Sequence, residues 1–426
     1  MSSKDKSVLI DVEEKLPKAH LIGICTPKDE DHRLKSMDEL ELLVKTMGLD
    51  TVTKNLQNRD HPDKTFFTGS GFIQNVISCM EEGDVLIFDN DLHPSQIRNI
   101  NKKFNIDILD RTEVILEIFQ QHAQSKEAKI QVNLARYEYE LPRLRNLWQH
   151  LDREKGTAST GGISRGSGEK QLELDRRYVR QKIRKAKKDL KKIAGAKEMQ
   201  RQYRYSHFKK VCVVGYTNAG KSTLFNVLTD SNVLVEDKLF ATLESTSRSL
   251  NLGKGRDIIL SDTVGFISQL PHHLVASFRA TLQEVKDADL LLHIIDASSN
   301  DYITHINDVV TVLTEIKCDT IQRKMIFNKI DLLSKNELTS LKEKYPDAVF
   351  ISATKKRNLD FLLEQVDDQL NMAHKVSFLI PHIEQKAISQ MFELGDILKK
   401  EYREDGVLLQ VILNDEDLYM FEKWKV

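Results

Sequence analysis

Short apolar runs alternate with amphipathic stretches along the first part of the chain. Leu21–Ile24 and Val85–Phe88 have the length and composition of buried strands, whereas Met37–Met47 carries its apolar residues at helical spacing. This alternation is typical of an α/β unit with a mainly parallel sheet. We therefore predict an N-terminal α/β subdomain over residues 1–125.

The apolar period changes near Glu127. Two seams with alternating steps of about four and three residues, separated by a glycine-rich stretch, predict a pair of packed helices. The seams are Ile130, Leu134, Tyr137, Leu141, Leu144, Trp148 and Leu151, and then Leu172, Val179, Ile183, Ala186, Leu190 and Ile193. We predict an antiparallel helical hairpin over residues 126–207, with a flexible tip at 156–169 and a kink or interruption at Pro142.

The remaining chain returns to strands and helices. Residues 208–374 predict a further α/β domain, and residues 375–426 predict a small α+β domain with a helical stretch from Ile383 to Tyr402. The apolar runs of the larger unit are Val211–Val214, Ile258–Leu260, Met325–Phe327 and Val349–Ile351. The whole chain is thus predicted to be an α/β multidomain protein.

Charge is balanced over the chain but not along it. The 63 basic and 64 acidic residues leave a net charge of -1, which favours no class of partner. The segment from Arg176 to Lys210, however, contains fifteen basic residues and only two acidic ones. Such a face suits a nucleic-acid backbone, and we prefer RNA to the alternative of a solvated helix surface. The candidate RNA-binding residues are Arg165, Lys170, Arg176, Arg177, Arg180, Arg184, Lys187 and Lys191.

The cysteines and the apolar runs indicate the cellular compartment that we expect for the protein. The four cysteines lie far apart, which argues against a disulfide framework or a zinc site. No run approaches the roughly 18 apolar residues of a membrane span. We expect a soluble cytoplasmic protein that is monomeric when free.

A phosphate-binding loop follows the run Val211–Val214. Glycines let the backbone approach phosphate oxygens, Lys221 reaches the β- and γ-phosphates, and the Ser222 hydroxyl can ligate Mg²⁺. The loop consists of Gly215, Tyr216, Thr217, Asn218, Ala219, Gly220, Lys221 and Ser222. Because a strand precedes it and a helix follows, an accidental match is a poor explanation.

Two later segments select the base of the nucleotide. The Asp331 carboxylate can accept hydrogen bonds from guanine, which adenine cannot donate in the same way. The first segment is Asn328, Lys329, Ile330 and Asp331, and the second, whose backbone would meet guanine O6, is Ser352, Ala353 and Thr354. We therefore predict binding of GTP and GDP.

Two segments are candidates for sensing the γ-phosphate. In the segment Asp262, Thr263, Val264 and Gly265, Asp262 would hold Mg²⁺ through water and the Gly265 amide would contact the γ-phosphate. The other segment is Phe240, Ala241, Thr242, Leu243 and Glu244. We predict that Thr242 completes the Mg²⁺ shell, with Thr246 as its competitor, and that Lys221 and Gly265 act in catalysis.

Phe266 follows Gly265, where many GTPases have a glutamine that orients the attacking water. A phenyl ring cannot hydrogen-bond water in that way. We predict slow intrinsic hydrolysis, with a partner or another residue positioning the water.

These motifs together resemble the HflX family of translational GTPases. The resemblance is carried by Asp89–Asn99, Gln131–Ala135, Gly166–Glu173, the phosphate loop, Phe240–Leu243 and Asp262–Phe266. It implies a Ras-like P-loop GTPase domain, binding to the large ribosomal subunit with the hairpin toward the peptidyl transferase region, ribosome-stimulated hydrolysis, and separation of stalled or idle ribosomes. The chain departs from the family pattern in the hairpin tip, where Ser167 replaces a proline and Lys170 adds a charge, and at Glu244–Thr246.

Two other functions use the same residues. A GTP-regulated RNA-binding factor or chaperone that acts away from the ribosome would use the basic helix equally well, and a signalling or scaffold switch would bind protein through the hairpin. Stimulation of hydrolysis by assembled large subunits, rather than by RNA alone, separates the first from the ribosomal reading. Neutralising the basic residues of the hairpin tests the second: it should abolish binding to the ribosome, whereas a switch that binds protein would be largely unaffected.

Overall fold

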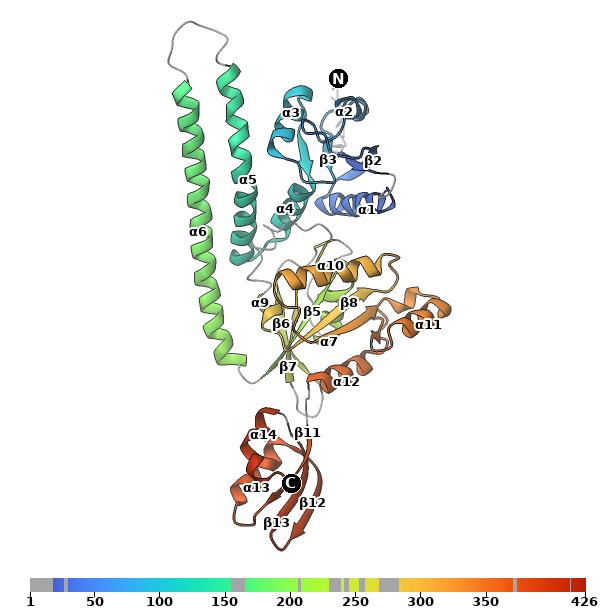
Figure 1. The fold of residues 1–426 in the computed structure, drawn as a ribbon, viewed down its shortest axis with the longest axis vertical. Coiled ribbons are helices and arrows are strands. Elements are labelled where there is room, and N and C mark those ends of the chain that lie inside the picture. Colours follow the sequence, from blue (N-terminus) through green and yellow to red (C-terminus); the bar gives the residue numbers. More distant parts are fainter. Residues whose placement is uncertain are drawn as a thin grey trace, which may run out of the picture.

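A computed structural model describes residues 18–26, 30–154, 165–205, 208–229, 239–240, 245–252, 257–267, 283–370, 374–413 and 415–426. For residues 145–154, 165–172 and 196–205 only the helical backbone is described. Within these ranges the predicted α/β multidomain class is confirmed (Figure 1). No helix in the described part is long and apolar enough to cross a membrane.

The N-terminal sheet is parallel, with strand order β2-β1-β3-β4. The strands are β1 (Lys18–Cys25), β2 (Asp50–Asn58), β3 (Val85–Phe88) and β4 (Ile108–Asp110). The helices are α1 (Glu30–Met47), α2 (Ser70–Ile77), α3 (Pro94–Phe104) and α4 (Arg111–His122). Side chains alternate across a strand, so Leu21 and Ile22 of β1 enter apolar clusters on opposite faces of the sheet.

The hairpin consists of α5 (Lys126–Glu154) and α6 (Arg165–Tyr205), which lie side by side along the N-terminal domain, and the end of α5 and the start of α6 point away from the larger sheet of the next domain (Figure 1). The predicted interruption at Pro142 is wrong, because α5 continues through it. A proline removes one backbone donor, and the other hydrogen bonds carry the helix past it. Gly166 and Gly168, predicted in the loop, lie in the first turn of α6, where backbone amides need no helical acceptor.

A second apolar stripe on α5 was not predicted. Ala128, Val132, Ala135 and Tyr139 are buried in the cluster that also contains the core of α1 and α4. Helix α5 therefore packs against the N-terminal sheet domain on one face and against α6 on another.

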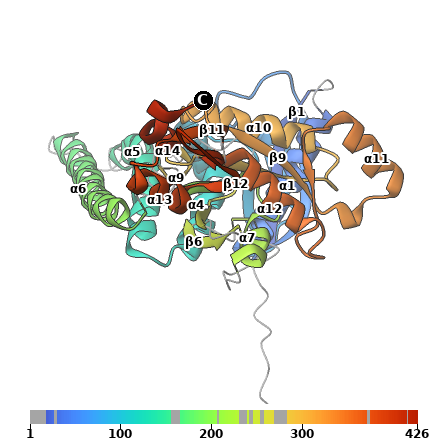
Figure 2. The same cartoon turned by 90° about the horizontal axis from the view of Figure 1, so that it is seen from below.

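The second α/β domain has a sheet of order β10-β9-β8-β5-β7-β6, in which only β6 is antiparallel to its neighbour. The strands are β5 (Lys209–Gly215), β6 (Thr246–Asn251), β7 (Asp257–Asp262), β8 (Leu290–Asp296), β9 (Arg323–Asn328) and β10 (Val349–Phe350). The helices are α7 (Lys221–Thr229), α9 (Gln283–Lys286), α10 (Tyr302–Glu315), α11 (Lys335–Lys344) and α12 (Leu359–Leu370). Seen from below, α6 and α11 lie on opposite sides of the molecule (Figure 2).

The C-terminal domain is an antiparallel sheet of order β11-β13-β12 covered by two helices. Its elements are β11 (His374–Ile380), α13 (Gln385–Leu394), β12 (Asp396–Arg403), β13 (Gly406–Leu413) and α14 (Asp415–Phe421). The predicted helix to Tyr402 is wrong, because α13 ends before Gly395 and a strand follows. A Cβ on Gly395 would lie 2.3 Å from Val411, so the chain passes too close to β13 for any larger residue.

Candidate nucleotide-binding site

The phosphate loop connects the end of β5 to the start of α7. Gly220 in this loop has φ +91°, and a Cβ there would lie 2.2 Å from the Asn328 amide nitrogen. Only glycine fits that backbone and that contact. The loop therefore has the strand-to-helix geometry that directs amide groups toward an anion.

Lys221 is buried beneath the loop. Its Nζ donates a 2.7 Å hydrogen bond to the carbonyl of Tyr216, and the residue is 6% exposed. Burial lowers the pKa of Lys221 to about 8, although Asp262 acts in the opposite direction. Bound phosphate would supply the negative charge that a buried ammonium group requires.

Ser222 and Asp262 form a pair beside Lys221. The Ser222 hydroxyl donates to Asp262 Oδ2 over 2.6 Å, and Asp262 Oδ1 is buried without a hydrogen-bond partner among the described residues. Burial raises the pKa of Asp262, while the bond from Ser222 lowers it. A hydroxyl beside an unsatisfied buried carboxylate oxygen fits the oxygen ligands that Mg²⁺ prefers.

The segment after Asp262 is hydrogen-bonded to the phosphate loop. Phe266 N donates to the Gly215 carbonyl over 3.1 Å, and Thr217 N donates to the Phe266 carbonyl over 2.7 Å. A Cβ on Gly265 would lie 2.8 Å from Thr217 and 3.0 Å from Lys221 Nζ. The Phe266 ring is buried in the core and cannot reach a water molecule at the phosphate. Two residues lie between Asp262 and Gly265. The Thr263 hydroxyl donates to the Val213 carbonyl, and Val264 packs at the edge of the same core as Phe266.

Asn328 joins the phosphate loop to the base-binding segments. Its amide nitrogen donates to the Ala219 carbonyl and its amide oxygen accepts from Ala353 N, both over 3.0 Å. Lys329 has φ 64° and pairs with Asp296 over 2.7 Å, a partner that the sequence did not reveal. Ile330 and Asp331 lie in the short turn that follows. Ser352 is buried, whereas Thr354 is exposed.

The first switch segment is described only in part. Ala241, Thr242, Leu243 and Glu244 lie outside the described residues. The Phe240 ring is buried against Phe119 of α4, with centroids 4.7 Å apart. Thr246, the competitor of Thr242, is the first residue of β6 and pairs with Asp262.

The candidate RNA-binding residues are separate from this site. Arg177, Arg180, Arg184, Lys187 and Lys191 are exposed on α6, and Arg176 is partly buried. Lys187 pairs with Glu138 of α5 over 2.7 Å, so it also holds the hairpin together. Arg165 and Lys170 lie on α6, but their side chains are outside the described part.

Comparison with known proteins identifies the family. Family models match residues 34–120 (GTP-binding GTPase N-terminal), 122–204 (GTP-binding GTPase middle region) and 210–329 (50S ribosome-binding GTPase). The GTPase HflX of Caldanaerobacter subterraneus is 39% identical and covers 90% of this chain and 88% of its own. That of Lacrimispora saccharolytica is 39% identical and covers 96% of both chains.

A solved structure is also similar. The GTP-binding protein of Sulfolobus solfataricus in complex with GDP is 26% identical, covers 83% of this chain and 98% of its own, and has a TM-score of 0.42. The alignments with these two relatives span nearly the full length of both chains. The phosphate loop and the base-binding segments have the geometry described above. The chain therefore belongs to the HflX family of GTPases, and it binds GTP and hydrolyses it.

Proposed function

We propose that this GTPase binds the large ribosomal subunit through its hairpin and separates stalled or idle ribosomes into subunits. The observation that carries this proposal is the row of exposed basic side chains on α6, on a hairpin that extends away from the nucleotide site. The family model over residues 210–329, described as a 50S ribosome-binding GTPase, supports it. A ribosomal partner also implies a location in the cytoplasm.

Mg²⁺ fits the residues beside the phosphate loop. Ser222 and Asp262, with Thr242 from the first switch, would hold it, and the bound ion would neutralise charge on the β- and γ-phosphates. Lys221 contributes a fixed positive charge to the same phosphates. Gly265 brings a backbone amide close to Lys221, where it can contact the γ-phosphate.

Slow intrinsic hydrolysis follows from Phe266. Its ring is 3% exposed and packs in the core, so the chain offers no side chain at this position to orient water. The proposed role of the ribosome is to supply or position the missing group. Loss of the γ-phosphate would then release the switch segments and favour dissociation.

The test is steady-state GTP hydrolysis with and without purified large subunits, at low and high salt, with ribosomal RNA alone as a separate arm. The variant R180Q/R184Q/K191Q removes charge from α6 and leaves the Lys187–Glu138 pair intact. The control K335Q/K342Q/K344Q removes as many charges from α11, on the opposite side (Figure 2).

Salt-sensitive stimulation by subunits that is lost in the α6 variant and kept in the control supports the proposal. Equal stimulation by RNA alone would favour the RNA-binding factor instead. Absence of any stimulation, with GTP binding intact, would show that the ribosome is not the partner.

A further inference from the structure

Tyr216 connects the phosphate loop to the N-terminal domain. Its carbonyl accepts the hydrogen bond from Lys221. Its hydroxyl donates a hydrogen bond to Glu39 of α1, which belongs to the N-terminal domain. Its ring is 8% exposed and stacks on His305 of α10, with centroids 3.9 Å apart. One residue therefore holds both the phosphate-binding lysine and a carboxylate of another domain.

Glu39 is held in turn by Arg111, the first residue of α4. The Arg111 guanidinium is buried and also donates to Asp89 over 2.9 Å and to the Ser36 carbonyl over 3.3 Å. We call Tyr216, Glu39, Arg111 and Asp89 the Tyr216 link. Desolvation offsets much of the attraction within a buried ion pair, so the role we assign to this one is to fix geometry rather than to add stability.

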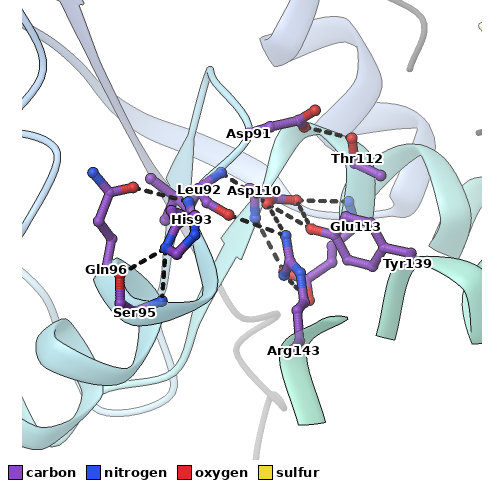
Figure 3. Close-up of polar contacts among 10 residues, drawn as sticks. All are labelled: Asp91, Leu92, His93, Ser95, Gln96, Asp110, Thr112, Glu113, Tyr139 and Arg143. Carbon is purple, nitrogen blue, oxygen red and sulfur yellow. Dashed lines mark hydrogen bonds and ion pairs between the residues drawn. The ribbon is translucent and has the colours of Figure 1, made fainter. Parts of the chain in front are cut away.

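The residue before Arg111 anchors the hairpin. Asp110 caps α4 and accepts hydrogen bonds from Tyr139 and Arg143 of α5 (Figure 3). Arg143 also donates to Glu113 over 3.0 Å and lies over the Tyr139 ring, 3.6 Å from its centroid. We call Asp110, Glu113, Tyr139 and Arg143 the hairpin-base cluster.

The Tyr216 link and the hairpin-base cluster meet at consecutive residues, Asp110 and Arg111, whose Cα atoms are about 3.8 Å apart across one rigid peptide. Farther along the same helix, Phe119 packs on Phe240 at the edge of the first switch. Helix α4 thus contacts the hairpin and Phe240 directly, and it reaches the phosphate loop through Glu39. A pocket of about 360 Å³ that is open to solvent lies beside Glu39, Tyr216 and His305, so these side chains have space in which to move.

We propose that Tyr216, Glu39 and Arg111 are positioning residues of the GTPase site, which couple the state of the phosphate loop to the direction of the hairpin through the hairpin-base cluster. The proposal rests on the proposed function only in assigning the hairpin to the ribosome. Its tests use the free protein, so they succeed or fail independently of the ribosomal partner.

The first test measures the distance between spin labels at Lys188 of α6 and Asn336 of α11, with GDP and with a nonhydrolysable GTP analogue. The exposed Cys79 is replaced by serine, since the other three cysteines are buried. Y216F removes one hydroxyl and keeps the ring and the carbonyl. The control K35A breaks the exposed Lys35–Asp301 pair, which joins the same two domains outside the link.

We expect the distance distribution to differ between the two nucleotides, the difference to fall by roughly half or more in Y216F, and K35A to behave like the unsubstituted protein. An unchanged response in Y216F, or no response in the unsubstituted protein, would overturn the proposal.

A second test compares GDP and GTP-analogue affinities of Y216F, R143K and the double variant. Tyr216 and Arg143 are not in contact, so independent effects would multiply to within about twofold. Coupling predicts that each single substitution changes the affinity ratio by about fivefold and that the double variant resembles the stronger single one. A multiplicative double variant, or unchanged single variants, would contradict it.

Discussion

The candidate nucleotide site and the basic face of α6 are built in opposite ways. At the nucleotide site, Lys221, Asp262 and Asn328 are buried and each has a fixed hydrogen-bond partner. On α6 the basic side chains are exposed and repeat along one helix. Binding at the first region should depend on the position of single atoms, whereas binding at the second should depend on the total positive charge. Substitutions should therefore have large individual effects in the first region and small, additive effects in the second.

The largest effect is expected for Gly220→Ala. The added methyl would meet the Asn328 amide at 2.2 Å in a backbone conformation that alanine avoids, so we expect GDP and GTP affinity to fall about 100-fold. Fluorescent-nucleotide titration measures it. Gly71→Ala is the matched control, since a Cβ there meets nothing within 4 Å. Equal affinities in both variants would mean that the loop is less constrained than described.

A smaller effect is expected for Asn328→Ala. Its amide joins Ala219 to Ala353, and loss of both hydrogen bonds should weaken GDP binding by about 2 kcal/mol, or roughly 30-fold. Calorimetric titration with GDP provides the measurement, and the exposed Asn336→Ala is its control. A loss below about threefold would show that Asn328 does not organise the base pocket.

Single charge removals on α6 should have still smaller effects. R180Q, R184Q and K191Q are each expected to lower the affinity for large subunits a few-fold and to reduce the slope of log affinity against log salt by about one. Sedimentation at several salt concentrations gives both quantities. If one residue accounted for nearly all the affinity, α6 would recognise its partner through a specific contact, and the contrast with the nucleotide site would disappear.

The remaining prediction concerns stability rather than binding, at the hairpin-base cluster of α4 and α5. Burial raises the pKa of Asp110 to about 6 and that of Glu113 to about 7, against the opposing charge of Arg143. The folded cluster therefore holds a proton more tightly than the unfolded chain. Its contribution to stability is complete below the ordinary carboxyl pKa and is lost as pH rises through about 7.

Hydrogen exchange of α4 and of the part of α5 around Tyr139 and Arg143, corrected for intrinsic rates, should show local opening becoming easier from pH 5 toward pH 7.5, by roughly one unit of log exchange rate. Glu113→Gln should flatten this dependence, while Glu117→Gln, on the same helix, should not. A steeper dependence in Glu113→Gln would assign the proton to another group.

The parts of the site that could be predicted from sequence are those defined by local spacing. The phosphate loop, Asp262 and Asn328 each follow a recognisable strand, and a parallel sheet brings strand ends to one edge. Contacts between distant segments could not be predicted. The hydrogen bond from Tyr216 to Glu39, the packing of Phe240 on Phe119 and the pairing of Lys329 with Asp296 depend on how whole elements pack.

The same limit explains the errors in the fold. The helical hairpin follows from its two seams, but the second stripe of α5 is visible only once its partner, α4, is known. The helix predicted up to Tyr402 includes strand β12, whose residues from Asp396 to Arg403 are mostly polar, and their conformation is decided by pairing with β13.

The length of α6 has a mechanical consequence. The helix has 41 residues, which at about 1.5 Å per residue gives a rod of about 60 Å. It ends at Tyr205, and β5 begins at Lys209 and runs to Gly215, the first residue of the phosphate loop. A force applied at the far end of α6 is therefore transmitted along the covalent backbone to β5, the strand that ends at the phosphate loop.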